Sequence, residues 1–355
     1  MRALTFQGKQ QISYDSVADP GIEKSSDVIV KTTLTAICGS DLHVYHGRES
    51  GIDSGTVMGH EFIGEIVAVG KDVRNFSVGD PVLSPFFSAC GQCAYCESDI
   101  SCRCTNGHLF GWVENGAGLQ GVQAEYVRVP LADSTLLKIP ENIMPIEALL
   151  LCDIFPTGYF CADMAEVKPG GAYAVIGCGP VGLLAIIGLR TLGAEQIFAI
   201  DLVAERLAMA AQFGAIPVNG RNDDAAGMIR EQTGGAGPDA VLEVVGSLPA
   251  QQLAYDLVRP GGILSVVGVH TTGNFAFSPV DLYNKNITYK TGRCPVQRYL
   301  PTLIPVVQEK KYDLHSLISH QMPLAEGVRG YEIFDQKLDG CTKVVLAPGS
   351  LESSK

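Results

Sequence analysis

The sequence predicts an α/β protein with two domains, one rich in β-strands and one built on a doubly wound parallel sheet. Two observations support this fold class. Short β-branched segments broken by glycine, proline and aspartate dominate the chain up to about residue 150, whereas strand-like and helix-like segments alternate beyond it. The length of 355 residues agrees, because one hydrophobic core seldom serves so long a chain.

The N-terminal part shows little helical periodicity and contains several segments with the composition of strands. Four of them are Val28–Leu34, Phe62–Val69, Asp80–Leu83 and Tyr126–Val129. We assign residues 1–150 to a β-rich domain. The pattern becomes mixed past about residue 290, so we expect residues 291–355 to return to this domain.

The middle of the chain alternates between the two kinds of element. The predicted strands are Tyr173–Ile176, Ile197–Ile200, Ala240–Val244 and Ile263–Val267, and the predicted helices include Gly182–Thr191 and Ala204–Phe213. Such alternation is typical of βαβ units, which place their strands in a parallel sheet. Residues 151–290 are therefore predicted to form the second domain.

Charge and cysteine content limit the classes of partner and compartment. The net charge of −12 repels nucleic acid and acidic membrane surfaces, and no apolar run reaches the roughly 20 residues that span a bilayer. The N-terminus has no apolar core of a signal peptide.

The chain contains eleven cysteines, an odd number, and four of them have metal-ligand spacing. These features favour thiolate–metal chemistry in the cytoplasm over a disulfide framework.

A glycine-rich loop follows one predicted strand and opens a predicted helix. In this context three glycines at such spacing bind the pyrophosphate of a dinucleotide, because they permit a tight turn, close backbone approach and helix–strand packing. The alternative is a tight turn alone. The predicted cofactor-binding residues of the loop are Gly177, Gly179, Pro180, Val181 and Gly182.

The next predicted strand ends in a carboxylate, Asp201. An acidic residue there hydrogen-bonds the hydroxyls of the adenosine ribose. The same carboxylate, followed by Leu202 rather than arginine, would repel a 2′-phosphate. NAD is thus favoured over NADP.

Four cysteines within fifteen positions have the spacing of metal ligands: Cys90, Cys93, Cys96 and Cys104. Zinc favours tetrahedral thiolate sites, and four thiolates leave no position for a substrate, so the sequence predicts a structural zinc site. Cys102 competes with Cys104 for the fourth place. An iron–sulfur cluster and free thiols are the alternatives.

The order of these motifs resembles the zinc-dependent medium-chain alcohol dehydrogenases over essentially the whole chain. The motifs are Cys38–His43 (Cys-Gly-Ser-Asp-Leu-His), Gly59–Gly64 (Gly-His-Glu-x-x-Gly), the four-cysteine segment, Gly177–Gly182, Val78–Asp80 and a C-terminal strand at Lys343–Val345. The resemblance implies a GroES-like catalytic domain at residues 1–150 with a zinc lobe at about 88–105. It also implies a Rossmann NAD-binding domain at 151–290, a return to the catalytic domain at 291–355, and an active cleft between the domains.

The resemblance also implies a second, catalytic zinc, held by a cysteine, a histidine and a third residue near the start of the Rossmann domain. Cys38 and His60 match the first two positions, and Asp153 matches the third, with Cys152 as its competitor. Carboxylate oxygen is a good zinc ligand, which favours Asp153. Glu61 could also reach the metal, and we expect Asp41 to hydrogen-bond the far nitrogen of His60.

The remaining site residues follow from the same resemblance. Zinc would lower the pKa of an alcohol hydroxyl, Ser40 would take up its hydrogen bond, and the proton would pass by way of the nicotinamide ribose to His43. Hydride would move to the nicotinamide. Thr157 matches a contact to the nicotinamide, Arg206 is placed near the adenosine, and Lys343 resembles a pyrophosphate-binding residue.

We therefore expect an NAD-dependent enzyme with two zinc ions per chain that interconverts small alcohols with aldehydes or ketones. A formaldehyde or polyol dehydrogenase is the first alternative, and members resembling this chain include the glutathione-independent formaldehyde dehydrogenases. A non-catalytic zinc- and nucleotide-binding protein is the second. The segment between Cys104 and Tyr126 is shorter than the loop of the dimeric animal enzymes of this family. It resembles the tetrameric microbial type, which implies a homotetramer rather than a dimer.

Overall fold

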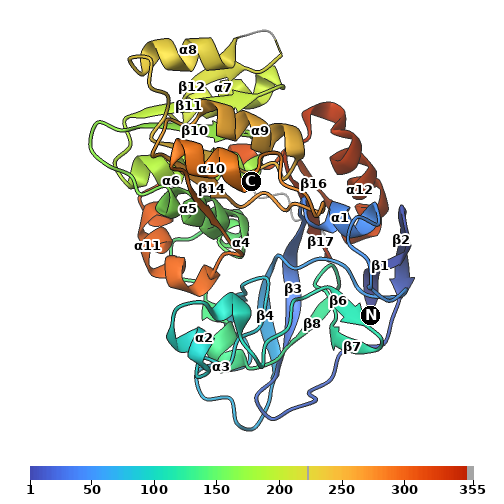
Figure 1. The fold of residues 1–355 in the computed structure, drawn as a ribbon. Coiled ribbons are helices and arrows are strands. Elements are labelled where there is room, and N and C mark those ends of the chain that lie inside the picture. Colours follow the sequence, from blue (N-terminus) through green and yellow to red (C-terminus); the bar gives the residue numbers. More distant parts are fainter. Residues whose placement is uncertain (222–223, 350–355) are drawn as a thin grey trace. The chain divides into compact units, whose positions relative to one another are not determined.

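A computed structural model describes residues 1–221 and 224–349, which form two compact units (Figure 1). The first unit combines the chain up to Asp153 with the segment that begins at Pro295, and the second is Ile154–Cys294. Within the part of the chain that is described, the search for a helix of sufficient length and apolarity to cross a membrane finds none.

A seven-stranded mixed sheet forms the centre of the first unit. Its strands, in hydrogen-bonded order, are β16 (His320–Pro323), β17 (Val344–Ala347), β3 (Val28–Ile37), β4 (Phe62–Val69), β5 (Pro81–Leu83) and β9 (Leu137–Lys138), with β8 (Tyr126–Val129) also paired to β3. Two hairpins flank the sheet: β1 (Arg2–Gly8) with β2 (Gln11–Ser16), and β6 (Trp112–Glu114) with β7 (Ala117–Leu119). Most residues of β3 and β4 are buried, with exposed positions alternating only in the middle of each strand, and their buried side chains contribute to the apolar core of the unit.

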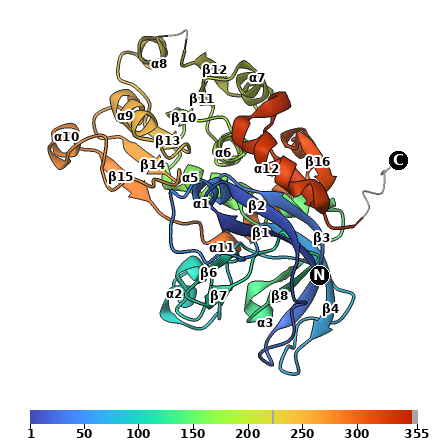
Figure 2. The same ribbon diagram turned by 90° about the vertical axis from the view of Figure 1, so that its right-hand side faces the viewer.

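The helices of the first unit are short, apart from two near the C-terminus. They are α1 (Asp41–Tyr45), α2 (Ala94–Glu97), α3 (Ala132–Thr135), α4 (Pro145–Leu150), α11 (Val296–Gln308) and α12 (Gly327–Gln336). Helix α12 lies beside β16 (Figure 2) and buries Tyr331 and Ile333. Gly327 allows the start of α12 to lie close to β1, because a Cβ atom there would lie 2.3 Å from the Leu4 side chain.

The second unit is built on a six-stranded parallel sheet. Its strand order is β12 (Ile216–Asn219), β11 (Gln196–Asp201), β10 (Ala172–Ile176), β13 (Ala240–Glu243), β14 (Ile263–Val266) and β15 (Thr288–Thr291). The helices of this unit are α5 (Ile154–Met164), α6 (Pro180–Thr191), α7 (Ala204–Gln212), α8 (Ala225–Gln232), α9 (Leu248–Leu257) and α10 (Pro279–Lys285). Strand order reverses between β10 and β13, the point at which doubly wound sheets bind ligands. The predicted fold class is confirmed.

Candidate active site

The glycine loop connects β10 to α6, as the sequence predicts. Gly177 has φ +94°, a conformation that favours glycine. A Cβ atom on Gly182 would lie 1.8 Å from the carbonyl oxygen of Gly177, so only glycine lets the helix pack this closely. Gly179 is the N-cap of α6, and a Cβ atom there would meet only the Arg206 guanidinium, at 3.9 Å. The backbone at Gly179 is therefore open to an approaching anion.

Asp201 ends β11 and holds the loop in place. Its carboxylate accepts hydrogen bonds from the backbone N–H groups of Cys178 at 2.6 Å, Leu202 at 2.6 Å and Val203 at 2.9 Å. Each carboxylate oxygen accepts more than one hydrogen bond, so capacity for a ligand hydroxyl remains. Arg206 is half-buried on α7 of the same unit, and Thr157 is half-buried on α5.

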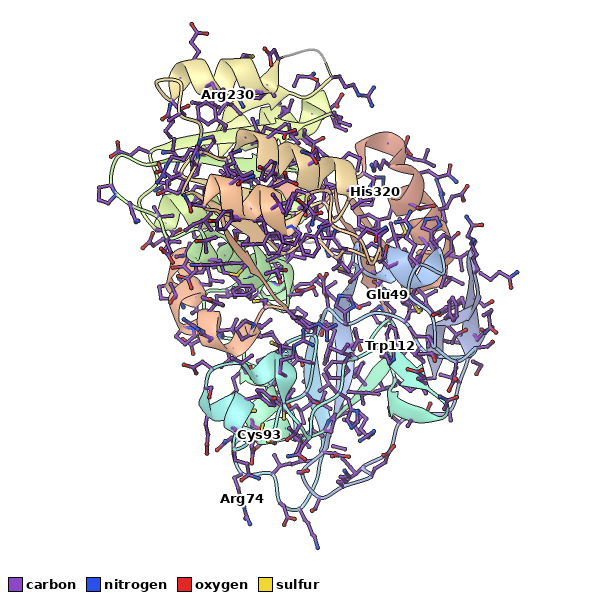
Figure 3. The ribbon with its side chains drawn as sticks, viewed as in Figure 1. Glu49, Arg74, Cys93, Trp112, Arg230 and His320 are labelled. Carbon is purple, nitrogen blue, oxygen red and sulfur yellow. The ribbon has the colours of Figure 1, made fainter. Side chains whose placement is uncertain are left out.

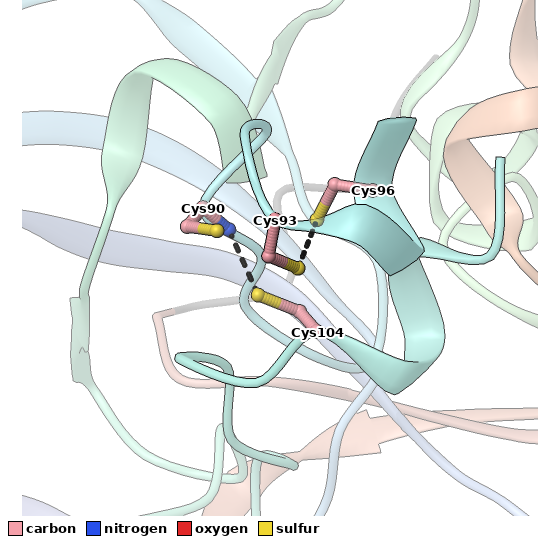
Figure 4. Close-up of side chains that lie close together, drawn as sticks. All are labelled: Cys90, Cys93, Cys96 and Cys104. Carbon is pink, nitrogen blue, oxygen red and sulfur yellow. Dashed lines mark hydrogen bonds between the residues drawn. The ribbon is translucent and has the colours of Figure 1, made fainter. Parts of the chain in front are cut away.

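The four predicted cysteine ligands gather around α2 (Figure 4). Their sulfur atoms lie within 4.8 Å of one another, and the group includes Cys104 rather than Cys102. The sulfur atoms of Cys93 and Cys96 are 3.5 Å apart. Backbone N–H groups of Cys96 and Thr105 lower the pKa of Cys93 to about 5, so this thiol is ionised at neutral pH. Thiolates supported by backbone donors fit a zinc ion well.

A second group of metal-ligand type is buried at one end of the main sheet of the first unit. Strands β3 and β4 pair in antiparallel register, with Thr35 opposite Phe62. This pairing brings Cys38, just after β3, next to His60 and Glu61, just before β4. Asp153, which follows α4, completes the group, and one ligand atom of each residue lies within 4.8 Å of the others.

The distances within this group match those between ligands of a tetrahedral ion. The Asp153 carboxylate lies 3.4 Å from His60 Nε2 and 3.7 Å from Cys38 Sγ. Ligand atoms that are about 2.0–2.3 Å from one tetrahedral zinc lie roughly 3.3–3.8 Å from each other. The donor set of thiolate, imidazole and carboxylate therefore fits zinc.

The side chains of this group carry an excess of negative charge that a cation would neutralise. Glu61 Oε1 accepts a hydrogen bond from Lys343 Nζ at 2.6 Å, and both side chains are buried. Glu61 Oε2 is buried without a partner among the described residues. With Cys38 and Asp153 ionised, three anions face one ammonium, and a divalent ion makes the group formally neutral. Lys343 thus lies beside the metal group, and its predicted pyrophosphate contact stays a prediction.

The ionisation of His60 reflects the same excess of negative charge. Burial lowers the pKa of His60, but Asp41, Cys38 and Asp153 outweigh burial and raise this pKa well above its usual value. As expected, Asp41 lies on the far nitrogen of the ring, with Oδ1 at 3.2 Å from Nδ1. Burial, followed by Glu61, raises the pKa of Cys38. A metal ion would relieve both effects.

Cys152 lies outside this group. Its thiol is fully buried and donates to the carbonyl oxygens of Phe62 at 3.0 Å and Ala148 at 3.5 Å. Burial raises its pKa far above the usual value, which disfavours the thiolate that a metal needs. The geometry brings Asp153, and not Cys152, to the other donors.

Two further predicted site residues lie beside the group. The Ser40 hydroxyl is 3.4 Å from His60 Nε2. His43, on α1, is half-buried, and its Nδ1 has no partner among the described residues. Burial lowers the pKa of His43, and Arg48 and His46 act in the same direction, so its imidazole is neutral and able to accept a proton at neutral pH.

Two aromatic residues of the first unit, Phe86 and Trp112, have different surroundings. The Phe86 ring lies edge-on to the His60 ring, with centroids 6.2 Å apart. Trp112 lies on β6, away from the lobe that carries Cys93 (Figure 3), and packs against the apolar cluster around Leu4.

Sequence reasoning did not find two polar residues behind the Asp41 side chain, namely Gln123 and Tyr331. His46 and His270 each bond a carboxylate, Asp335 and Glu243 respectively. No spacing motif links these residues, so the sequence carried no local signal for them.

Comparison with known proteins identifies the family of the chain. Residues 24–141 match the alcohol dehydrogenase GroES-like domain family, and residues 180–309 match the zinc-binding dehydrogenase family. A zinc-type alcohol dehydrogenase B from Aspergillus flavus is 41% identical over 343 residues, 94% of this chain and 79% of the relative. A glutathione-independent formaldehyde dehydrogenase from Bacillus subtilis is 31% identical and covers 98% of this chain and 97% of its own length. The solved alcohol dehydrogenase from Thermus sp. ATN1 superimposes with a TM-score of 0.91 at 39% identity, over 98% of this chain and 99% of the other. The chain therefore belongs to the zinc-dependent medium-chain alcohol dehydrogenases.

Proposed function

We propose that the protein transfers hydride between a small alcohol and NAD at a zinc ion held by Cys38, His60 and Asp153. The observation that carries this proposal is the convergence of these three donors, from three separate segments, at distances that suit one tetrahedral ion. Three protein ligands leave the fourth position open, as catalytic zinc sites require. When bound, zinc would supply a Lewis acid that lowers the pKa of the alcohol, and NAD would accept the hydride.

Ser40 and His43 are proposed to carry the proton away from the alcohol. The Ser40 hydroxyl lies 3.4 Å from His60 Nε2, where it would accept the hydrogen bond of a substrate hydroxyl. His43 accepts the proton, because its lowered pKa keeps the imidazole neutral and its buried Nδ1 lacks a protein partner among the described residues. Glu61 balances the charge of the site and remains a candidate ligand through its unpaired Oε2.

The dinucleotide is proposed to bind the second unit at the loop from Gly177 to Gly182. Pyrophosphate would accept hydrogen bonds from the backbone at the N-terminus of α6, which carries a partial positive charge. Asp201 would bind the ribose hydroxyls and exclude a 2′-phosphate, which favours NAD over NADP. Thr157 and Arg206 are proposed as further contacts, to the nicotinamide and the adenosine side.

The four-cysteine group is proposed to hold a second zinc ion, with a structural role. Four thiolate ligands close the coordination sphere, so no substrate can reach this metal. The proposal thus requires two zinc ions per chain.

A formaldehyde or polyol dehydrogenase is a second candidate function. The similarity to the formaldehyde dehydrogenase from Bacillus subtilis favours it, because the catalytic groups alone do not distinguish one primary alcohol from another. We also propose a homotetramer, on the resemblance of the short Cys104–Tyr126 segment, and a cytoplasmic location, where thiolates stay reduced.

A cofactor-reduction screen tests the function directly. Purified zinc-loaded protein is assayed with NAD and with NADP against primary, secondary and polyhydric alcohols and hydrated formaldehyde. We expect reduction of NAD by one of these classes and a much lower kcat/KM with NADP. Binding of zinc and nucleotide without turnover on any substrate would support the non-catalytic alternative instead, and faster reduction of NADP would contradict the role proposed for Asp201.

A further inference from the structure

We propose that Gln123 and Tyr331 are positioning residues for the metal ligand His60 and act on it through Asp41. The inference rests on the metal-binding role proposed above for His60. A continuous chain of polar contacts, one ion pair followed by hydrogen bonds, joins the imidazole to helix α12. Gln123, Asp41 and Tyr331 are buried, at 0%, 4% and 1% exposure, so water does not replace the bonds they make.

The chain begins at the imidazole nitrogen that faces away from the metal group. Asp41 Oδ1 lies 3.2 Å from His60 Nδ1, while Asp41 Oδ2 accepts hydrogen bonds from the backbone N–H of Cys38 at 2.9 Å and from Gln123 Nε2 at 3.2 Å. An ionised carboxylate only accepts hydrogen bonds, so His60 Nδ1 must be the donor. The lone pair of His60 Nε2 then points to the Asp153 side of the group, as a metal ligand requires.

Gln123 is the next residue in this series of contacts. Its Nε2 donates to the backbone carbonyl of Ala36 at 3.1 Å as well as to Asp41, and both of these groups are acceptors. The amide can therefore have only one orientation, which leaves Oε1 to accept a hydrogen bond. Tyr331 supplies it, because its hydroxyl donates to Gln123 Oε1 at 2.8 Å.

The space for Gln123 is created beside the metal ligand itself. Gly59 precedes His60 and has φ +86°. A Cβ atom on Gly59 would lie 2.5 Å from Gln123 Cγ, so any other residue there would displace the Gln123 side chain. The glycine of the Gly-His-Glu motif thus makes room for the residue that supports Asp41.

Tyr331 connects this series of hydrogen bonds to α12. A second contact joins α12 to the end of α1. Burial raises the pKa of Tyr331 well above its usual value, so the phenol stays protonated and keeps its donor role. One turn further along α12, Asp335 Oδ1 bonds His46 Nε2 at 2.6 Å, just after the end of α1. Helix α1, which begins at Asp41, is therefore held at both ends by the same face of α12.

Loss of this support is expected to weaken zinc binding rather than only the fold. Without the Gln123 amide, Asp41 loses one of three donors and is free to rotate away from His60. Groups that orient a ligating histidine typically change metal affinity by about 10–100-fold. We therefore expect Gln123→Leu to weaken zinc binding at this group by about 10–100-fold, and Tyr331→Phe by a smaller factor.

The test is competition for zinc between a chromophoric chelator and the full-length protein carrying Gln123→Leu or Tyr331→Phe. Tyr173→Phe is the matched control, because Tyr173 is also a buried tyrosine, and its hydroxyl accepts from the backbone N–H of Lys168 at 2.6 Å in the other unit. We expect the control to bind zinc as the wild type does. Affinity of the four-cysteine group should be unchanged in every variant. The double variant should bind no more weakly than Gln123→Leu alone, because Tyr331 acts only through Gln123.

Wild-type zinc affinity in both variants, with only a loss of thermal stability like that of Tyr173→Phe, would overturn the inference. If Gln123→Leu does not fold, Tyr331→Phe decides alone, with the absorption spectrum of the cobalt-substituted protein as a second readout. Failure of the proposed function looks different. If the proposed function is wrong, Asp153→Asn would also retain its second zinc ion. If only this inference is wrong, Asp153→Asn would lose that zinc ion, and the Gln123 and Tyr331 variants would keep it.

Discussion

The first unit contains two metal-ligand groups that are built in opposite ways. The four-cysteine group comes from one short segment, is partly exposed, and stabilises its thiolates with backbone N–H groups. The group around His60 collects residues from three distant segments, is largely buried, and depends on side chains of other elements, such as Asp41 and Lys343.

This difference explains what each group can do. A local set of four thiolates satisfies its own geometry and leaves no open position, so it suits a role in stability. Three buried donors of different kinds leave one position on the metal open. Each buried charge without a counter-charge is destabilising, so the residues that contact these donors must be placed accurately. The following substitutions should separate the two groups, since each should disturb one and spare the other.

The largest effect is expected for Cys38→Ser. Removing the thiolate should expel the catalytic zinc and lower kcat/KM by about 10²–10⁴-fold, because Lewis-acid stabilisation is worth several kcal/mol. Steady-state kinetics with NAD measure this. Cys341→Ser is the control, a buried cysteine outside both groups, and it should keep the activity. Equal losses in both variants would mean that the thiol of Cys38 matters only for packing.

Lys343→Met should have the next largest effect. It leaves Glu61 buried without its cation, which costs about 3–5 kcal/mol of unfolding free energy. Lys138→Met is the matched control, because Lys138 pairs with Asp80 at 2.8 Å at the surface, where water screens the charges, and should change stability much less. Chemical denaturation of both variants gives the two values. Similar values would show that burial does not distinguish the two pairs.

A substitution in the four-cysteine group should affect stability and spare catalysis. For Cys93→Ser we expect loss of one zinc ion and a Tm lower by about 5 °C or more, since each kcal/mol shifts Tm by about 2–4 °C in a domain of this size. Calorimetry and initial rates at 25 °C check both parts. Loss of activity at a temperature where the variant is still folded would contradict a purely structural role.

Acidification should release the two metals in order. Burial raises the pKa of Cys38, so protons compete with zinc there at a higher pH. In the four-cysteine group, backbone N–H groups lower the pKa of Cys93 to about 5, whereas burial raises the pKa of Cys96 to about 12. The acidic Cys93 thiol and a closed set of four ligands, compared with three at the His60 group, favour retention of zinc by the four cysteines. Zinc should therefore leave the His60 group first. A chromophoric chelator monitors release as the pH is lowered, with the Cys93→Ser and Cys38→Ser proteins identifying each step, and the reverse order would refute this assignment.

The sequence predicted the features that depend on local spacing. The glycines from Gly177 to Gly182 lie between a strand and a helix, and the four cysteines gather as their spacing indicates. Predicted strands coincide with observed ones to within a few residues at their ends. Strand β3 extends three residues beyond the predicted Leu34, because its buried positions continue to Ile37.

Features that depend on long-range register could not be predicted. Lys343 meets Glu61 because β17 pairs with β3, with Val344 opposite Ile37, across about 300 positions of sequence. Gln123 and Tyr331 meet for the same kind of reason, although they are 208 positions apart in the sequence. The hairpin of β1 and β2 was also missed, although alternation at Arg2–Phe6 carries a weak strand signal.

The central claim is that Asp153, and not Cys152, is the third ligand of the catalytic zinc. Elemental analysis of the zinc bound per chain tests it most directly in the wild type and in the variants Asp153→Asn and Cys152→Ala. We predict two zinc ions per chain in the wild type, one in Asp153→Asn and two in Cys152→Ala. Two in Asp153→Asn together with one in Cys152→Ala would contradict it.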